Sequence, residues 1–174
     1  MSPHPAAAPV PATARLFLAL WPGPATLRAL AAWQARWVWP AGAAVVAPER
    51  LHLTLHYIGP VAASRLPELT LGLALPLQRF ELGFGDAELW PRGLAVLCPS
   101  RVPDALATLH TQLRATLQRL NLPVETRAFR PHVTLARKAA GAVAPGDPPS
   151  MRWSVRSYAL VLSHGGYRSL QHYR

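Results

Sequence analysis

The chain has 174 residues, 51% hydrophobic and 15% charged, which excludes a disordered protein and suffices for one compact domain. Lys and Arg number 18 against 8 Asp and Glu, a net charge of +10, which favours an anionic partner such as nucleic acid because arginine donors suit phosphate oxygens. An arginine-rich coding bias would also explain this charge. The one cysteine, Cys98, excludes an internal disulfide, and the first apolar run (16–21) is too short to span a membrane, so we expect a soluble cytoplasmic monomer.

The first twelve residues are rich in Pro and Ala without periodicity, which predicts a disordered tail (1–12) before a single domain (13–174). In chain order, alternation and helical spacing predict a strand (15–20), a helix ending before Pro40, a strand (51–59), a weak helix (64–75), strands (80–87 and 93–98), a helix (103–120), a strand (132–136), a loop (141–150) and a final hairpin (153–163 and 167–173). Each half of the chain therefore has a helix that leads into a strand, which is an imperfect internal repeat.

Both of those strands carry a His-x-Thr motif, His52-Leu53-Thr54 and His132-Val133-Thr134. Chance predicts about 0.4 such motifs in a chain of this composition. Residues i and i+2 share a face of a strand, so each motif presents an imidazole beside a hydroxyl. In the first strand the same alternation places His56 on that face as well.

Two such strands facing each other would suit in-line displacement at a phosphodiester. One imidazole would take a proton from water and the other would give a proton to the departing sugar oxygen, while Thr54 and Thr134 bind the phosphate oxygens. Histidine suits both roles because its ordinary pKa is about 6.5. A zinc site is the alternative, but His52 and His56 would lie about 13 Å apart on a strand, too far for one metal ion. We therefore expect no metal and no cofactor.

The segments around the two motifs, Leu51 to Leu55 and Arg130 to Arg137, resemble the signatures of the 2H phosphoesterase superfamily. Within it, the chain is most similar to the bacterial RNA 2′,3′-cyclic phosphodiesterases, also called 2′-5′ RNA ligases. The resemblance extends to the Arg15-Leu16-Phe17 segment, to Ile58-Gly59 and to the Gly166–Leu170 ending. The shortness of the last turn, His164-Gly165-Gly166, is a departure from the family.

The resemblance implies an α+β fold of two pseudo-symmetric lobes, with antiparallel sheets around a central cleft and helices outside. It implies hydrolysis of a 2′,3′-cyclic phosphate on RNA to a 2′-phosphomonoester, with His52 as general acid and His132 as general base. Thr54, Thr134 and Arg137 would hold the phosphate. The partner would be RNA with a cyclic phosphate end, or a small cyclic nucleotide.

Other readings stay open at this point. The chain could join RNA ends through a 2′,5′ linkage, act on small cyclic nucleotides, or bind RNA without catalysis. Three aromatic residues, Phe17, Phe129 and Tyr167, are candidates for stacking on a base, although each would serve equally well as a core residue.

Overall fold

The computed structural model describes residues 12–174, so the predicted tail lies outside the described residues apart from Ala12. Apart from two short 3-10 turns (Pro48–Arg50 and Ala63–Arg65), the elements are β1 (Thr13–Leu20), α1 (Pro24–Gln34), β2 (Ala44–Val45), β3 (Leu53–Ala62), α2 (Leu66–Gly72), β4 (Phe80–Trp90), β5 (Leu94–Pro99), α3 (Asp104–Arg119), β6 (Val133–Arg137), β7 (Arg152–Val155), β8 (Tyr158–Ser163) and β9 (Tyr167–Tyr173).

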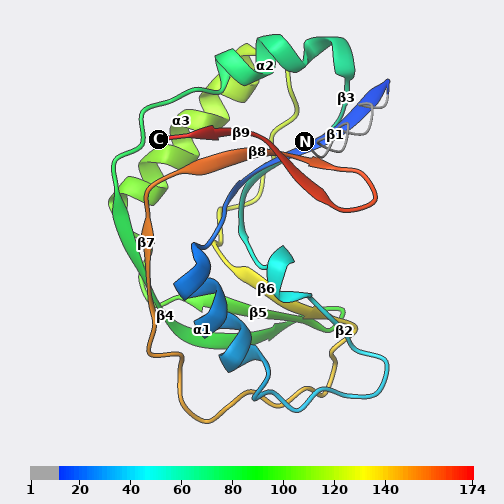
Figure 1. Ribbon diagram of the computed structural model, residues 1–174, viewed down its shortest axis with the longest axis vertical. Coiled ribbons are helices and arrows are strands. Elements are labelled where there is room, and N and C mark those ends of the chain that lie inside the picture. The colour runs from blue at the N-terminus through cyan, green and yellow to red at the C-terminus, as the bar shows by residue number, and fades with distance from the viewer. Residues whose placement is uncertain (1–11) are drawn as a thin grey trace, which may run out of the picture.

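The strands form one antiparallel sheet that divides into two lobes. Its order is β7-β4-β5-β6-β3-β1-β8-β9, with β2 beside β6. The halves β3-β1-β8-β9 and β6-β5-β4-β7 are mirrored in order about the β3–β6 boundary, where one residue pair, Leu53 with Val133, joins them. The ribbon accordingly separates into an upper and a lower part (Figure 1). The predicted bilobal α+β fold is confirmed.

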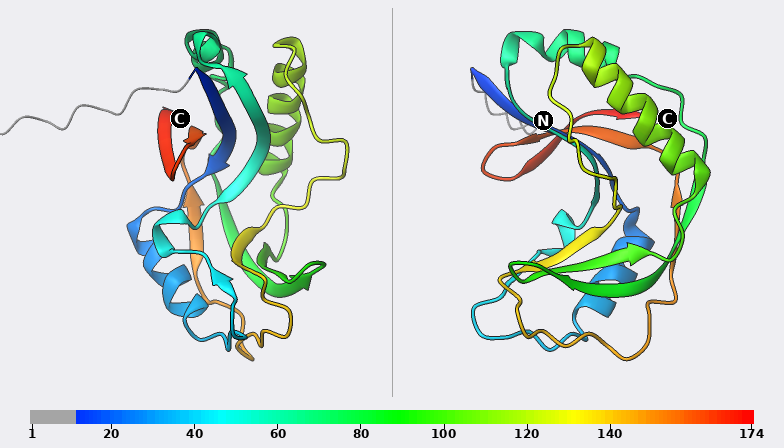
Figure 2. Two further views of the ribbon diagram at one scale, coloured as in Figure 1. Left: turned by 90° about the vertical axis from the view of Figure 1, so that its right-hand side faces the viewer. Right: turned by 180° about the vertical axis from the view of Figure 1, so that it is seen from behind.

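Each of the longer helices packs on the lobe opposite to the strand that precedes it. α1 follows β1 of the upper lobe, but its Gln34 side chain donates hydrogen bonds to the carbonyls of Val46 and Leu135, beside and within the lower sheet, both at 2.9 Å. α3 follows β5 of the lower lobe and crosses the upper lobe, as the view from behind shows (Figure 2). The exchange of helices ties the two lobes together.

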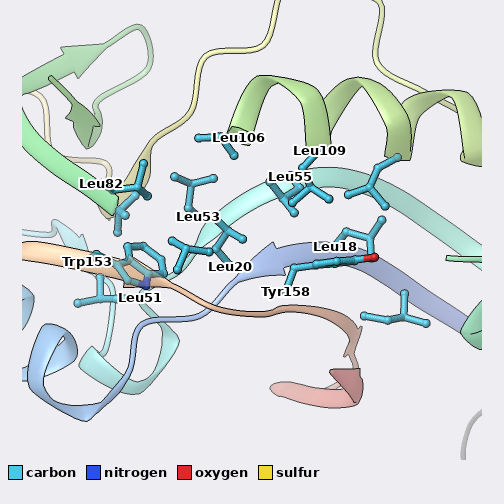
Figure 3. Packing of buried hydrophobic residues seen from close by; sticks show 14 of the residues in the cluster. Leu18, Leu20, Leu51, Leu53, Leu55, Leu82, Leu106, Leu109, Trp153 and Tyr158 are labelled. Carbon is cyan, nitrogen blue, oxygen red and sulfur yellow. The ribbon is translucent and has the colours of Figure 1, made fainter. Parts of the chain in front are cut away.

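The core is mainly leucine. In α3 the buried stripe recurs at helical spacing, as its amphipathic pattern predicts (Leu106, Leu109, Leu113 and Leu117). Leu106 and Leu109 lie close to Leu53 and Leu55 of β3 (Figure 3). This packing holds β3, which begins directly after His52, against α3.

The predicted long strand 153–163 is wrong, because it is two strands that belong to different lobes. β7 pairs with β4 of the lower lobe, whereas β8 pairs with β1 and β9 of the upper lobe. Arg156 and Ser157 interrupt the strand, and the alternation of apolar residues does not reveal such a change of partner. The hairpin between β8 and β9 is confirmed, with Gly165 at φ 64° in its turn.

Candidate active site

The two His-x-Thr motifs lie side by side at the boundary between the lobes. Leu53 and Val133 are paired and fully buried, so their sequence neighbours point to the opposite face, where all four motif side chains are half-buried. In an antiparallel pair, this register places His52 opposite Thr134 and Thr54 opposite His132. The register therefore relates the two motifs by an approximate twofold axis, with each histidine at the position opposite the threonine of the other motif.

Arg137 joins this face through a β-bulge. It is five residues after His132, and an odd spacing would place it on the core side of a regular strand. The pairing of β6 with β5 slips by one residue at Leu135, so that Leu135 and Ala136 are both buried and Arg137 is exposed. The bulge thus returns Arg137 to the side of the histidine.

The first motif has the same bulge, which corrects the prediction for His56. The pairing of β3 with β1 slips at Leu55, after which His56 is only 4% exposed and Tyr57 is 46% exposed. His56 therefore leaves the face of His52 and packs on α3, where its ring stacks on His110 at 4.0 Å between centroids. The expected imidazole on the active face is absent because of this bulge.

His52 is held in a cage of aromatic rings. Trp21 stacks on it at 4.8 Å between centroids, Phe17 lies at 5.2 Å and Tyr167 at 5.3 Å. The Arg50 guanidinium lies 4.5 Å above the Tyr167 ring. We call these five residues the His52 half-site.

His132 has a smaller cage of matching design. Trp90 contacts it at 4.5 Å between centroids, and the Arg130 guanidinium lies 4.3 Å above the Trp90 ring. Glu88 accepts hydrogen bonds from Trp90 Nε1 at 2.5 Å and from Arg130 Nη2 at 2.9 Å. These four residues form the His132 half-site.

The backbone fixes the tautomer of both imidazoles in the same way. His52 Nδ1 lies 2.6 Å from the carbonyl oxygen of Arg50, and His132 Nδ1 lies 2.7 Å from that of Arg130. A carbonyl oxygen only accepts, so Nδ1 must carry the proton in both rings. Nε2 is then the nitrogen that can accept or donate a proton in chemistry, and both histidines present the same one.

The surroundings lower the pKa of both histidines below the usual value near 6.5. Burial is the largest cause in each case. Arg50, His132 and Arg137 further lower the pKa of His52, while Arg127, Arg130 and Arg137 further lower that of His132. The field of Arg137 thus reaches both rings, which is the electrostatic sign that the two motifs share one site.

Positive charge at this site is only partly neutralised. The described residues contain five ion pairs, which include Arg130–Glu88 and Arg127–Glu125. Within residues 12–174, neither Arg50 nor Arg137 forms one. The site therefore favours an anion between the two histidines.

The three candidate stacking residues lie in different surroundings. Tyr167 is 36% exposed beside His52, whereas Phe17 is only 5% exposed beneath it. Phe129 stacks on His110 at 3.8 Å between centroids, so it belongs to the packing of α3. Of the three, Tyr167 has the exposure that stacking on a ligand requires.

Five residues of the half-sites were not predicted from the sequence: Arg50, Arg130, Trp21, Trp90 and Glu88. A signal existed for the two arginines, since each stands two residues before its histidine in Arg50-Leu51-His52 and Arg130-Pro131-His132. The repeat could have been extended to include them. The other three come from distant segments and have no such signal.

The fold and the sequence of this chain are both similar to those of known phosphoesterases. A solved phosphoesterase shares the fold with a TM-score of 0.81 and 28% identity, covering 92% of this chain and 97% of that one. The fold is that of the bilobal phosphoesterases. The model of the 2′-5′ RNA ligase superfamily matches residues 22–163, and the chain belongs to this family.

Two curated relatives and one ligand complex illustrate the similarity. The chain is 36% identical over 136 residues to the RNA 2′,3′-cyclic phosphodiesterase of Escherichia coli, covering 75% of this chain and 76% of the relative. It is 32% identical to the Thermus thermophilus protein of the same name, covering 68% and 66% respectively. The structure of E. coli LigT with 3′-AMP matches with a TM-score of 0.80 and 26% identity, covering 92% of this chain and 97% of that one.

In the part of the chain that spans residues 12–174, no helix is long and apolar enough to cross a membrane. Nor do the His, Cys, Asp and Glu side chains of these residues form a group of three that could hold a metal ion.

Proposed function

We propose that this protein hydrolyses 2′,3′-cyclic phosphate ends of RNA to 2′-phosphomonoesters, with His52 as general acid and His132 as general base. The activity is that of its curated relatives, both named RNA 2′,3′-cyclic phosphodiesterase. One observation carries the chemistry: two imidazoles with the same fixed tautomer on one face of the β3–β6 pair. Neither alone would supply both a proton donor and a proton acceptor.

In this mechanism His132 Nε2 removes a proton from the attacking water. His52, protonated at Nε2, gives its proton to the departing 3′ oxygen. In each ring the Nδ1 proton stays on its nitrogen and keeps its hydrogen bond to the backbone carbonyl. Each ring therefore keeps its orientation while Nε2 changes protonation. After one turnover the protonation states of the two rings are exchanged, and solvent restores them.

The phosphate would be bound by the groups around the histidines. Thr54 and Thr134 would donate hydrogen bonds to the non-bridging oxygens, and Arg137 would stabilise the negative charge that develops on them. The bulge in β6 supports this role, because it turns Arg137 toward the histidines. Arg50 and Tyr167 form a cationic and aromatic surface next to His52 on which a base could stack.

Binding of the anion would also prepare the acid. In the free protein the pKa of His52 is lowered, so its neutral form prevails near pH 7. A phosphate beside His52 favours the imidazolium and raises that pKa. The substrate therefore supplies part of the charge that keeps its own general acid protonated.

The partner in the cell would be RNA that bears such an end, and we expect the protein to act as a cytoplasmic monomer. The relatives' superfamily name also includes RNA end joining. Joining would use the same two histidines in the same roles with a 5′ hydroxyl in place of water: His132 would take the hydroxyl proton and His52 would protonate the departing 3′ oxygen, leaving a 2′,5′ linkage. We therefore regard it as the second activity of this site.

The test is release of a 2′-phosphomonoester from an oligoribonucleotide with a 2′,3′-cyclic end, in the presence of excess chelator. We expect full activity with chelator and a product that phosphatase converts to a free end. Binding of the oligonucleotide without turnover would show a non-catalytic RNA-binding module instead. Loss of turnover on chelation would refute the cofactor-free mechanism.

A further inference from the structure

We infer that Glu88 is a positioning residue for His132, acting through Trp90 and Arg130; this inference rests on the proposed role of His132 as the base. Glu88 lies on β4, outside both motifs, and its side chain is 37% exposed. It is part of a closed ring of contacts that begins and ends at the imidazole.

The first arm of the ring runs through Trp90. Glu88 accepts the indole hydrogen bond at 2.5 Å, and the indole contacts the His132 ring at 4.5 Å between centroids with planes tilted by 58°. An indole has one polar hydrogen, so this single bond decides how the ring is oriented about its long axis. The orientation of Trp90 in turn limits how far His132 can tilt.

The second arm runs through Arg130. Glu88 accepts from its guanidinium at 2.9 Å, the guanidinium lies 4.3 Å above the Trp90 ring, and the Arg130 carbonyl accepts the Nδ1 proton of His132 at 2.7 Å. Glu88 therefore restrains the residue whose backbone fixes the tautomer. Both arms converge on the direction in which Nε2 points.

The charge of Glu88 also has a purpose here. Three arginines, Arg127, Arg130 and Arg137, oppose protonation of His132, and a base in such a field accepts a proton poorly. Glu88 is a carboxylate on this side of the site that offsets one of the three charges directly. Among the described residues, the His52 half-site contains no carboxylate, so the negative charge that favours a protonated His52 would come from the substrate phosphate.

The experiment compares Glu88→Ala, Glu88→Gln and Trp90→Phe with Glu81→Gln, which removes a carboxylate from the same strand where it faces Arg152 and Ser154. We expect Glu88→Ala to lower kcat about 10- to 100-fold with KM nearly unchanged, as for a misaligned catalytic group. Glu88→Gln keeps an acceptor for Trp90 and should recover most of that loss. The Glu81 variant should equal the wild type.

A second readout does not depend on turnover. NMR titration of the His132 imidazole, assigned with a His132→Asn variant, should show a lower pKa in both Glu88 variants by about half a unit, and a weaker preference for the Nδ1–H tautomer in Glu88→Ala. Because Glu88 and Trp90 act in series, Trp90→Phe added to Glu88→Ala should cost less than the sum of the two single losses.

The outcomes separate the two proposals. If the wild type does not hydrolyse the cyclic end, the proposed function fails, and the titration still decides whether Glu88 positions His132. If Glu88→Ala matches Glu81→Gln in kcat, pKa and tautomer, the inference about Glu88 is wrong, whatever the activity of the wild type. A loss of kcat with an unchanged His132 titration and tautomer would contradict it as well.

Discussion

The two half-sites have the same backbone arrangement but different side chains. In both, an arginine carbonyl two residues upstream fixes Nδ1 and an aromatic ring carries the guanidinium of that arginine. The same β-bulge follows both threonines. The differences lie in what fills equivalent positions: three aromatic rings around His52, but one ring and a carboxylate beside His132.

The duplicated strands thus place the two histidines in matching geometry, whereas the lobe around each strand determines which side chains surround its histidine. Four positions after the histidine, one half has buried His56 and the other has buried Ala136. Five positions after it, one has Tyr57 and the other Arg137. A symmetric backbone thereby carries asymmetric side chains, which suits the proposed reaction with one acid and one base.

The largest expected effect comes from removing either imidazole. His52→Ala and His132→Ala should each lower kcat about 10²- to 10⁴-fold, because each removes one positioned acid or base. The melting temperature should not fall, since both side chains are half-buried on the site face rather than in the core. Steady-state kinetics and thermal denaturation check this, and retention of activity by either variant would rule out the two-histidine mechanism.

The next largest effect is expected at the residue that stands five positions after each motif histidine. Arg137→Gln should lower kcat/KM by about 10- to 100-fold, since it removes a cation from the developing phosphate charge. Tyr57→Phe, at the equivalent place in the other half, should change it less than about threefold. Equal losses in the two variants would mean that the bulges do not distinguish the half-sites.

The pH profile tests the electrostatics of both halves at once. The pKa values of His52 and His132 are both lowered in the free protein, so kcat/KM should be bell-shaped with its maximum below about pH 6.5. The profile for kcat should lie at higher pH, because bound phosphate raises the pKa of His52. A flat kcat/KM between pH 5 and 9 would contradict these assignments.

The smallest expected effect is on stability. It concerns His56, four residues after His52, whose ring stacks on His110. Burial and the neighbouring His56 lower the pKa of His110 to about 4. The unfolded chain binds this proton below about pH 6.5 and the folded chain only near pH 4, so the free energy of unfolding should decrease as the pH falls through this interval. His110 is partly exposed, and with solvent screening we expect His110→Leu to remove about 1 kcal/mol of this decrease.

Urea denaturation at pH 7 and pH 4.5 measures that difference. His164→Leu, in the exposed β8–β9 turn, controls for the loss of one imidazole. An unchanged pH dependence in His110→Leu would show that the stack does not resist protonation.

The class of fold followed from the family resemblance, whereas the local patterns of the sequence by themselves predicted the motifs and the sites of most strands and helices. The reason is that His-x-Thr in a strand and the leucine stripe of α3 are local patterns, in which a spacing of two or of three and four residues fixes a face. The pairing of two histidines with two threonines could be predicted because both parts of each motif lie within three residues.

Only the tertiary structure decided which residues surround the two motif histidines. The bulges that bring Arg137 to the site and remove His56 from it depend on pairing with neighbouring strands, which no local pattern records. The break at Arg156 and Ser157 is likewise a change of partner strand. Trp21, Trp90 and Glu88 reach the histidines through the folded sheet, in which β1 pairs with β3, and β4 pairs with β5, the neighbour of β6. Their roles therefore follow from packing across the chain rather than from their own segments.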